Sequence, residues 1–165
     1  MYLRILSYIH DEAERTQRLK DLREIFFQTA KAAPDSIEKQ NKFFNQYAGL
    51  YIENWPDDVF FACDLESNKT VGYLIGCRDS KKAQPIITPL LPSYELFGEY
   101  FKKFPVHLHM NTHPAHQGVG VGTFLLLEFL LEMKKAGIKG THIVTSPEQK
   151  NVAFYLKHKF RFQVE

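Results

Sequence analysis

The chain has 165 residues, of which 44% are hydrophobic, including 14 Phe and 8 Tyr. This length and composition favour one globular domain over residues 1–165 with a buried core, and not a disordered chain. The net charge is +2 with acidic and basic residues interspersed, whereas nucleic-acid-binding proteins usually carry a basic patch. No apolar stretch approaches the roughly 20 residues that span a bilayer. We therefore expect neither a nucleic acid nor a membrane as a partner.

Two further features favour a cytoplasmic protein. The apolar run Met1–Leu6 is followed too soon by His10-Asp11-Glu12 to be a signal peptide. Cys63 and Cys77 fall in expected strands without a CxxC or other metal-ligand spacing. We expect two buried free thiols, which fits a reducing compartment.

The first part of the chain predicts an edge strand followed by two helices. Residues 2–8 have the pattern of the strand. A helix begins after Asp11 in a capping-box pattern, and Pro34 lies beyond its end. A second helix begins in the same way at Asp35 and stops before Trp55-Pro56. Its expected buried stripe consists of Ile37, Phe44, Tyr47 and Tyr51.

The middle of the chain changes from helical to strand periodicity. Residues 59–65 and 70–77 are two strand-like runs joined by a short polar segment, which predicts an antiparallel hairpin. Residues 79–92 contain three prolines and little periodicity, so a loop is expected there. Residues 94–104 are rich in aromatics and predict a short helix that covers part of the core.

The last third predicts alternating strands and helices. The expected elements are a strand over 106–112, a helix over 121–136, a strand over 141–145, a helix over 147–158 and a strand over 160–164. On helix 121–136, Glu128, Glu132 and Lys135 form one narrow polar stripe, so we expect this helix to be largely buried against a sheet. The element order predicts an α/β domain with a mixed central sheet flanked by helices.

The most informative segment is residues 114–122, Pro-Ala-His-Gln-Gly-Val-Gly-Val-Gly, between a predicted strand and a predicted helix. Glycines at a helix start expose backbone N–H groups at the positive end of the helix dipole, where a phosphate can bind. The dinucleotide pattern G-x-G-x-x-G does not fit, because Gly122 comes one residue early. The Walker sequence Gly-Lys-Ser/Thr is absent.

Two motifs in this region point to one family. The segment Gln117-Gly118-Val119-Gly120-Val121-Gly122 matches Gln/Arg-x-x-Gly-x-Gly/Ala and resembles the acyl-CoA pyrophosphate loop of the GNAT (Gcn5-related) N-acetyltransferase superfamily. Residues 154–160 resemble its Phe-Tyr-x-x-x-Gly-Phe ending. The resemblance spans the chain in element order and residues 106–160 in motifs. His107-Leu108-His109 is similar to the branch with the acetyltransferase-like domain of O-GlcNAcases.

The resemblance implies acetyl-CoA as co-substrate and direct acetyl transfer to a primary amine of a small molecule or a protein. The peptide groups of Met110 and Thr112 would pair with the pantetheine arm and polarise the acetyl carbonyl, and Tyr155 would be the proton donor to the leaving thiolate. The residues implied to hold the pyrophosphate are Gln117, Gly118, Val119, Gly120, Val121 and Gly122.

The base that deprotonates the amine is less defined. His107 and His109 share one face of their strand and titrate near neutrality, so each is either a base acting through water or a structural histidine in the core. No metal is expected, because His113 and His116 flank the glycine loop and no carboxylate joins the four histidines.

Two positions depart from the family pattern. Glu148 stands seven positions before Tyr155, where the family has Asn, and Lys159 replaces the usual Gly before the last Phe. A catalytically silent acetyl-CoA-binding module is therefore the alternative, and an interaction domain in which the glycine loop is only a tight turn is a third hypothesis. The acceptor and the oligomeric state stay open, with a homodimer among the options. Aromatics that could line the acceptor pocket are Tyr47, Tyr51, Trp55, Tyr94 and Phe97.

Overall fold

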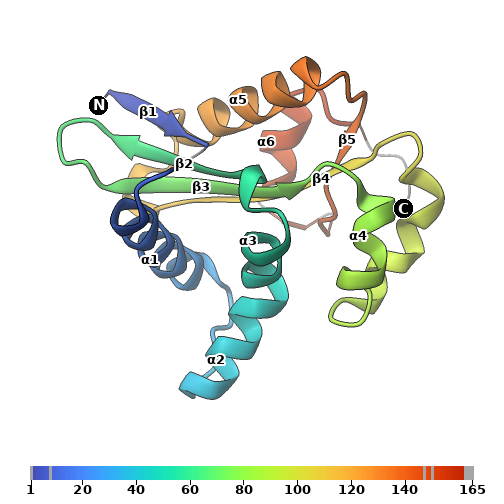
Figure 1. Cartoon of the computed structure of the whole chain (residues 1–165), viewed down its shortest axis with the longest axis horizontal. Helices are drawn as coiled ribbons and strands as arrows, with labels where there is room; N and C mark the ends of the chain where they lie inside the picture. Colours follow the sequence, from blue (N-terminus) through green and yellow to red (C-terminus); the bar gives the residue numbers. More distant parts are fainter. Residues whose placement is uncertain (1, 8, 147, 150, 162–165) are drawn as a thin grey trace.

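A five-stranded mixed sheet forms the centre of the protein. The computed structural model describes residues 2–7, 9–146, 148–149 and 151–161. The strands are β1 (Leu3–Leu6), β2 (Val59–Asp64), β3 (Thr70–Cys77), β4 (Val106–Thr112) and β5 (Thr141–His142), in the order β1-β2-β3-β4-β5. Strands β1 to β4 pair antiparallel, and β5 pairs parallel with β4. This arrangement confirms the predicted α/β class with a mixed central sheet (Figure 1).

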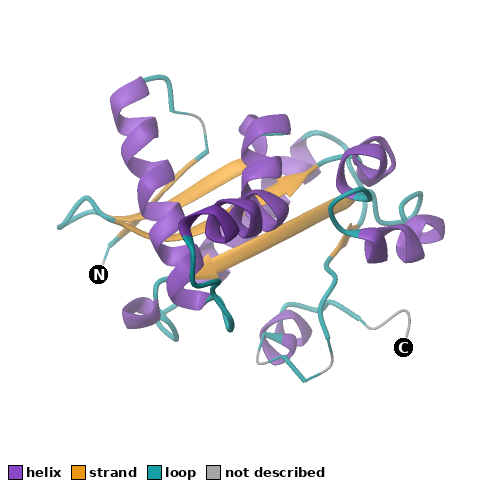
Figure 2. Ribbon diagram, turned by 90° about the horizontal axis from the view of Figure 1, so that it is seen from below, coloured by secondary structure: helices purple, strands orange, loops and turns teal. Residues whose placement is uncertain are grey.

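Helices cover both faces of the sheet (Figures 1 and 2). Figure 1 shows α5 and α6 on one face and α1 and α3 on the other, with α4 beyond one end of β3. The α-helices are α1 (Glu12–Thr29), α2 (Ile37–Phe44), α3 (Leu50–Asn54), α4 (Ser80–Ile87), α5 (Val121–Lys135) and α6 (Val152–Lys157). A π-helical segment, η1 (Asn45–Gly49), joins α2 to α3. The 3₁₀ segments are η2 (Pro56–Asp58), η3 (Pro92–Tyr100) and η4 (Pro114–His116). No helix within the described ranges is both long and apolar enough to cross a bilayer.

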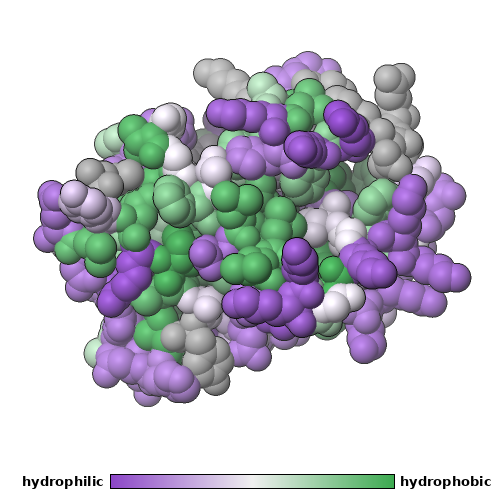
Figure 3. Space-filling model, turned by 90° about the horizontal axis from the view of Figure 1, so that it is seen from above, coloured by the Kyte–Doolittle hydropathy of each residue, from purple (hydrophilic) through white to green (hydrophobic). Residues whose placement is uncertain are grey.

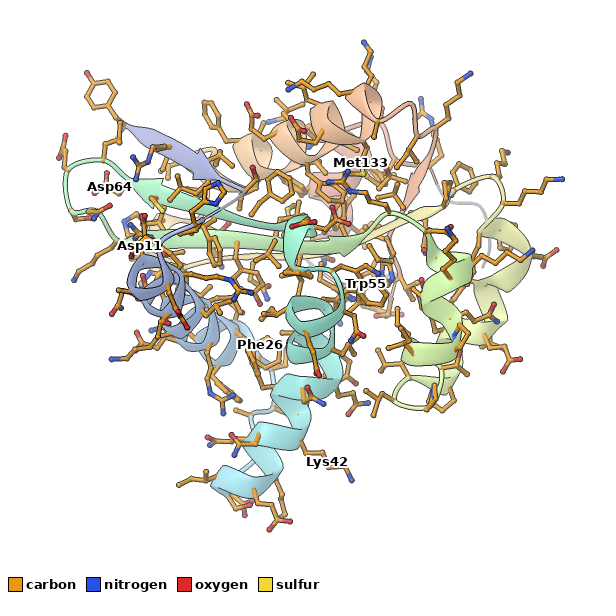
Figure 4. All side chains as sticks on the ribbon, viewed as in Figure 1. Asp11, Phe26, Lys42, Trp55, Asp64 and Met133 are labelled. Carbon is orange, nitrogen blue, oxygen red and sulfur yellow. The ribbon has the colours of Figure 1, made fainter. Side chains whose placement is uncertain are left out.

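The alternation of side chains along β4 separates two hydrophobic cores. Val106 and Leu108 belong to the core under α5 and α6. His107 and His109 point the other way, because successive strand residues face opposite sides of a sheet, and they contact Tyr51 of the core under α1 and α3. Figure 4 shows Met133 on the α5 side of the sheet, and Phe26 and Trp55 on the opposite side.

The starts of the first two helices were predicted well, with one correction. The Asp11 carboxylate accepts a hydrogen bond from the Glu14 amide at 2.7 Å and caps α1 as expected. The cap of α2 is Ser36 and not Asp35, whose side chain forms an ion pair with Lys39 instead. The prediction that Ile37 is buried was wrong, because this first residue of α2 lies at the periphery and is 77% exposed.

Residues 79–92, expected as a loop, contain α4. The Asp79 side chain accepts a hydrogen bond from the Lys82 amide at 3.1 Å and caps this helix. Pro85 lies inside it, and burial of Ala83 and Ile87 in the core offsets the backbone hydrogen bond that proline cannot make. The prolines therefore did not prevent a helix, because packing outweighed local propensity.

The C-terminal elements are shorter than predicted. The strand expected over 141–145 spans only Thr141–His142, and the helix expected over 147–158 begins at Val152. Of the strand expected over 160–164, residues 162–164 lie outside the described residues. Both cysteines are buried free thiols, as expected.

Helix α5 is less buried than its composition suggested. One side packs into the core through Leu125, Leu126, Phe129 and Met133. Phe124, Leu127 and Leu131 are 54%, 55% and 44% exposed, because their spacing puts them on the side away from the sheet. The prediction of a largely buried helix was therefore wrong for this stripe. Figure 3, viewed onto this side of the molecule, shows hydrophobic atoms at the surface.

Candidate functional site

The glycine loop follows β4 through η4 and leads into the first turn of α5. Gly118 and Gly120 have φ angles of +79° and +98°, a region that glycine enters without steric cost. No heavy atom of the described part of the chain lies within 4 Å of the position that a Cβ would take at either glycine. The two glycines are therefore required by the backbone conformation and not by packing, and the space beside them is open.

The amide groups of this loop are available to a ligand. Within the described chain, the amides of residues 118–123 donate no backbone hydrogen bond, and the Phe124 amide is the first to bond, to the Gly120 carbonyl at 3.0 Å. No side chain of a described residue caps this helix start. The Gln117 side chain donates to the Thr112 carbonyl at 3.2 Å and ties the loop to the strand. Unpaired amides at the positive end of a helix dipole are suited to bind an anion.

Beside the loop, β4 has an open edge. In the described residues, β5 pairs with β4 only at Val106 and His107. The Val106 amide points to the β5 side, where it donates to Gly140, and the His113 amide points to β3, where it donates to Val71. Backbone groups of alternate residues point to opposite sides of a strand. By this alternation, the peptide groups of Met110 and Thr112 point to the side that β5 leaves open.

Tyr155 lies on the α5 side of the sheet. It is 6% exposed, and its ring makes edge contacts with Phe154 and Phe160, each at 5.3 Å between centroids. Burial raises the pKa of Tyr155 to about 12. Its hydroxyl makes no hydrogen bond to any other described residue and is protonated at neutral pH.

The two residues that depart from the family motif, Lys159 and Glu148, lie in different local structures. Lys159 has a φ of +68°, so a lysine holds the left-handed turn expected at this position. Glu148 is exposed and accepts a hydrogen bond from Ser146 at 2.8 Å, and this bond lowers the pKa of Glu148. Asn151 instead accepts a hydrogen bond from Thr145 at 3.1 Å.

The two predicted base candidates lie together on the opposite face of the sheet from Tyr155. The Tyr51 hydroxyl lies 3.4 Å from His107 Nδ1 and 3.3 Å from His109 Nε2. His107 is 2% exposed, whereas His109 is half-buried. Burial, and secondarily the charges of His109 and His142, hold the pKa of His107 well below its usual range. Burial also lowers the pKa of His109 to about 4, so both rings are uncharged at neutral pH.

Two members of this cluster were not assigned to it from the sequence. Tyr51 was expected only as a core residue or part of an acceptor pocket, and its contacts depend on how α3 packs on β4. His142 is the cross-strand partner of His107 in the short parallel ladder, with ring centroids 4.8 Å apart. Its Nδ1 is 2.7 Å from the Phe104 carbonyl, and burial lowers its pKa. In the sequence, the presence of His142 in the predicted strand after the glycine loop was the only indication that it could join this cluster.

The histidines at the loop are separate from this cluster. His113 Nδ1 accepts a hydrogen bond from the Ala115 amide at 3.2 Å and shapes η4. His116 packs against His113 with ring centroids 5.4 Å apart. Among the described residues, no group of three or more His, Cys, Asp or Glu side chains could hold a metal ion.

Two hollows, of about 420 and about 610 Å³, lie between α1 and the α3–η2 segment on the histidine side of the sheet. Both are lined by Arg15, Leu19, Ile52 and Pro56. Of the five aromatics considered for an acceptor pocket, Tyr51 and Tyr94 belong to the buried core and the other three pack against it. Core packing accounts for all five.

The chain is similar in fold to several solved structures, and one of the three that follow is named as an N-acetyltransferase. SsHAT superposes with a TM-score of 0.74 and 23% identity, over 96% of this chain and 91% of that chain. PH1933 from Pyrococcus horikoshii OT3 gives a TM-score of 0.70 and 16% identity, over 99% and 92%. Glucosamine-6-phosphate N-acetyltransferase from Arabidopsis thaliana gives 0.57 and 13%, over 100% and 95%. A search of curated protein sequences gives no match.

The assignment to a family rests on the sequence pattern as a whole. The family model described as "Acetyltransferase (GNAT) family" matches residues 19–160. This match covers both sheet faces, the glycine loop and the segment around Tyr155. The chain therefore belongs to the GNAT acetyltransferase family.

Proposed function

We propose that this protein is an acetyl-CoA-dependent N-acetyltransferase that passes the acetyl group directly to a primary amine of a small molecule or a protein. The observation that carries the proposal is the set of unpaired amides of residues 118–123 at the start of α5, next to the open edge of β4. The amides of Gly118, Val119, Gly120, Val121 and Gly122 would face the pyrophosphate, next to Gln117, whose own amide donates to the Pro114 carbonyl at 3.4 Å.

The open edge of β4 supports a role in positioning the thioester. The Met110 peptide group and the Thr112 amide would pair with the pantetheine arm, whereas the Thr112 carbonyl already accepts a hydrogen bond from the Gln117 side chain at 3.2 Å. An N–H aimed at the oxygen that becomes negative in the transition state contributes about 2.7–4 kcal/mol to catalysis. Holding the amine and the thioester together supplies much of the remaining rate enhancement.

Tyr155 would assist departure of the thiolate. Burial raises its pKa to about 12, above the value of about 8.5 for a free thiol. We therefore assign Tyr155 as the donor of a hydrogen bond that stabilises the developing charge on sulfur, and not as a group that loses its proton completely. On the other face, the uncharged rings of His107 and His109 are the candidates for the base that accepts a proton from the attacking amine.

A catalytically silent acetyl-CoA-binding module is the second candidate. It is favoured by Glu148, which lies at the surface where the family motif has an asparagine. In that case the glycine loop would bind the co-substrate, but no acceptor would be acetylated.

Two measurements separate these functions. Isothermal titration calorimetry with acetyl-CoA tests both, since absence of binding would contradict each of them and favour an interaction domain. Release of free CoA thiol is then followed over a panel of primary amines and amino-terminal peptides. Thiol release that depends on an amine supports the enzyme, and binding without any release supports the silent module.

A further inference from the structure

Two glycines of β3, Gly72 and Gly76, lie beneath α5. Strand residues an even number of positions apart face the same side of a sheet, and the side chains of Val121, Leu125 and Phe129 share one side of the helix. These three side chains are at most 1% exposed. They include the α5 atoms nearest to the positions that a Cβ would take at the two glycines. Helix α5 therefore packs on a stretch of β3 that lacks a side chain at two positions.

We propose that Gly72 is a positioning residue for the co-substrate. Because it lacks a side chain, the first turn of α5 lies at the distance from β4 at which one molecule of acetyl-CoA reaches both parts of its site. These parts are the unpaired amides of residues 118–123 and the open edge of β4. The inference rests on the proposed acetyl transfer and adds a residue that acts on the site through its packing against α5.

A side chain at Gly72 would not fit under the first turn of α5. A Cβ there would lie 2.7 Å from Val121 Cγ1, and 3.2 Å from both Leu125 Cδ1 and the Asn111 carbonyl oxygen. The first distance is shorter than the separation of about 3.5–4.0 Å that is optimal for two carbon atoms. Valine in a helix has one strongly preferred rotamer. The overlap would therefore be relieved by a movement of the α5 backbone away from the sheet.

The contact at Gly72 holds the ligand-facing end of α5 beside the end of β4. Val121 is the first residue of α5, and its amide donates no backbone hydrogen bond within the described chain. Gly72 is the cross-strand partner of Thr112, whose amide would face the pantetheine arm. The next loop residue is also close to β4, because a Cβ at Gly122 would lie 3.7 Å from Met110 Cε. Packing at Gly72 thus sets the spacing between the two parts of the site.

This spacing matters because acetyl-CoA is a single molecule. Its pantetheine arm joins the pyrophosphate to the thioester, so both ends bind together only when the loop amides and the edge of β4 are correctly separated. A movement of α5 would displace the amides from the pyrophosphate while the peptide groups of β4 stayed in place. A misplacement of about 1 Å can lower the rate of an enzyme by about a hundredfold.

Gly76 approaches α5 as closely as Gly72, but farther from the loop. A Cβ there would lie 2.8 Å from Phe129 Cζ and 2.8 Å from the His107 carbonyl oxygen. Phe129 comes eight residues after Val121, which is about 12 Å along a helix axis. A substitution at Gly76 therefore crowds the same two elements to a similar extent, away from the unpaired amides. It separates an effect on packing from an effect on the loop.

The test compares Gly72→Ala with Gly76→Ala by calorimetric titration with acetyl-CoA, under conditions in which circular dichroism shows that both variants are folded. In Gly72→Ala, we expect the Kd for acetyl-CoA to rise by about tenfold or more, as overpacking moves the loop. In Gly76→Ala, we expect the Kd to be unchanged. Both variants should lose thermal stability, so a role in packing alone would not separate them.

A change in the helix tests the same contact from its other side. Val121→Ala removes Cγ1 and keeps the backbone amide, so the double variant Gly72→Ala/Val121→Ala should regain most of the lost affinity. If Gly72→Ala does not fold, Val121→Ile replaces it, because this substitution crowds the contact without altering the sheet. We expect it to weaken acetyl-CoA binding as well, and an unchanged Kd in this variant would overturn the proposal.

Two further results would also overturn it: equal Kd values for Gly72→Ala and Gly76→Ala, or no recovery in the double variant. Failure of the proposed function gives a different result. In that case the unaltered protein itself does not bind acetyl-CoA, whereas tight binding by the unaltered protein and by all variants contradicts only the role of Gly72.

Discussion

Substitution of Gly120 by glutamate tests the assignment of the loop most directly. A side chain at this position enters open space beside the unpaired amides, where the pyrophosphate would lie. A carboxylate about 4 Å from a phosphate charge costs about 4 kcal/mol at an effective dielectric constant of about 20. Since about 1.4 kcal/mol corresponds to a tenfold change in Kd, we expect acetyl-CoA affinity to fall by roughly a thousandfold.

The same helix provides a matched control at its other end. Gly137 follows α5, has a φ of +72°, and a Cβ added there would also have no heavy atom within 4 Å. Gly137→Glu therefore adds the same charge and a similar left-handed strain, which costs roughly 1–2 kcal/mol in each variant. We expect Gly137→Glu to lose the more thermal stability, because a negative charge is unfavourable at the C-terminal end of a helix and favourable at its start, and only Gly120→Glu to lose affinity in calorimetric titrations with acetyl-CoA. Equal Kd values for the two variants would refute the loop as the pyrophosphate site.

Three other predictions follow from the site. Tyr155→Phe should lower kcat at least several-fold while the Kd for acetyl-CoA stays within twofold, and unaltered turnover in a thiol-release assay would remove Tyr155 from the mechanism. Lys159→Gly should raise the free energy of unfolding by about 0.5 kcal/mol. The reason is that relief of about 1–2 kcal/mol of left-handed strain exceeds the roughly 0.5–1 kcal/mol entropic cost of glycine. A clear decrease in the free energy of unfolding, measured by urea denaturation, would contradict this prediction. Because the folded pKa values of His107, His109 and His142 are depressed, the unfolded chain binds more protons below about pH 6.5. The contribution of these rings to the free energy of unfolding is thus complete above that pH. It is lost as the pH falls toward 4, by up to about 1.4 kcal/mol per histidine and pH unit. If the free energy of unfolding of a His109→Gln variant depends on pH as steeply as that of the unaltered protein, His109 makes no contribution.

Several elements were predictable because their signals are local. The strand over 106–112 and the hairpin of β2 and β3 follow from apolar runs bounded by polar or proline-containing segments. The cap at Asp11 depends on residues three positions apart. The turn at Lys159 was expected from motif position alone, and its positive φ confirms that expectation.

Other features depend on contacts between distant segments. Helix α4 forms despite Pro85 because Ala83 and Ile87 reach a core that the local sequence does not reveal. The exposed stripe of α5 was missed because composition does not show which side of a helix meets the sheet.

In the candidate site, too, the features that depend on local sequence were predictable and those that depend on contacts between distant segments were not. The glycine loop and the open edge of β4 were expected from the motif, because both lie within one short stretch of chain. The contacts of Tyr51 with His107 and His109 join residues 56 and 58 positions apart, and no periodicity predicts them. The assigned roles of Tyr155 and the two histidines, and the O-GlcNAcase-like branch, stay predictions.

The separation of the two cores has a consequence for how such a protein diversifies. The residues of the core under α5 and α6 are all different from those of the core under α1 and α3, and the sheet lies between the two cores (Figure 1). Changes in α2 and α3 can therefore accumulate with less effect on the surroundings of the glycine loop than changes in α1, which contacts η4. Selection for a new acceptor can act on the first half of the chain while the co-substrate side is retained.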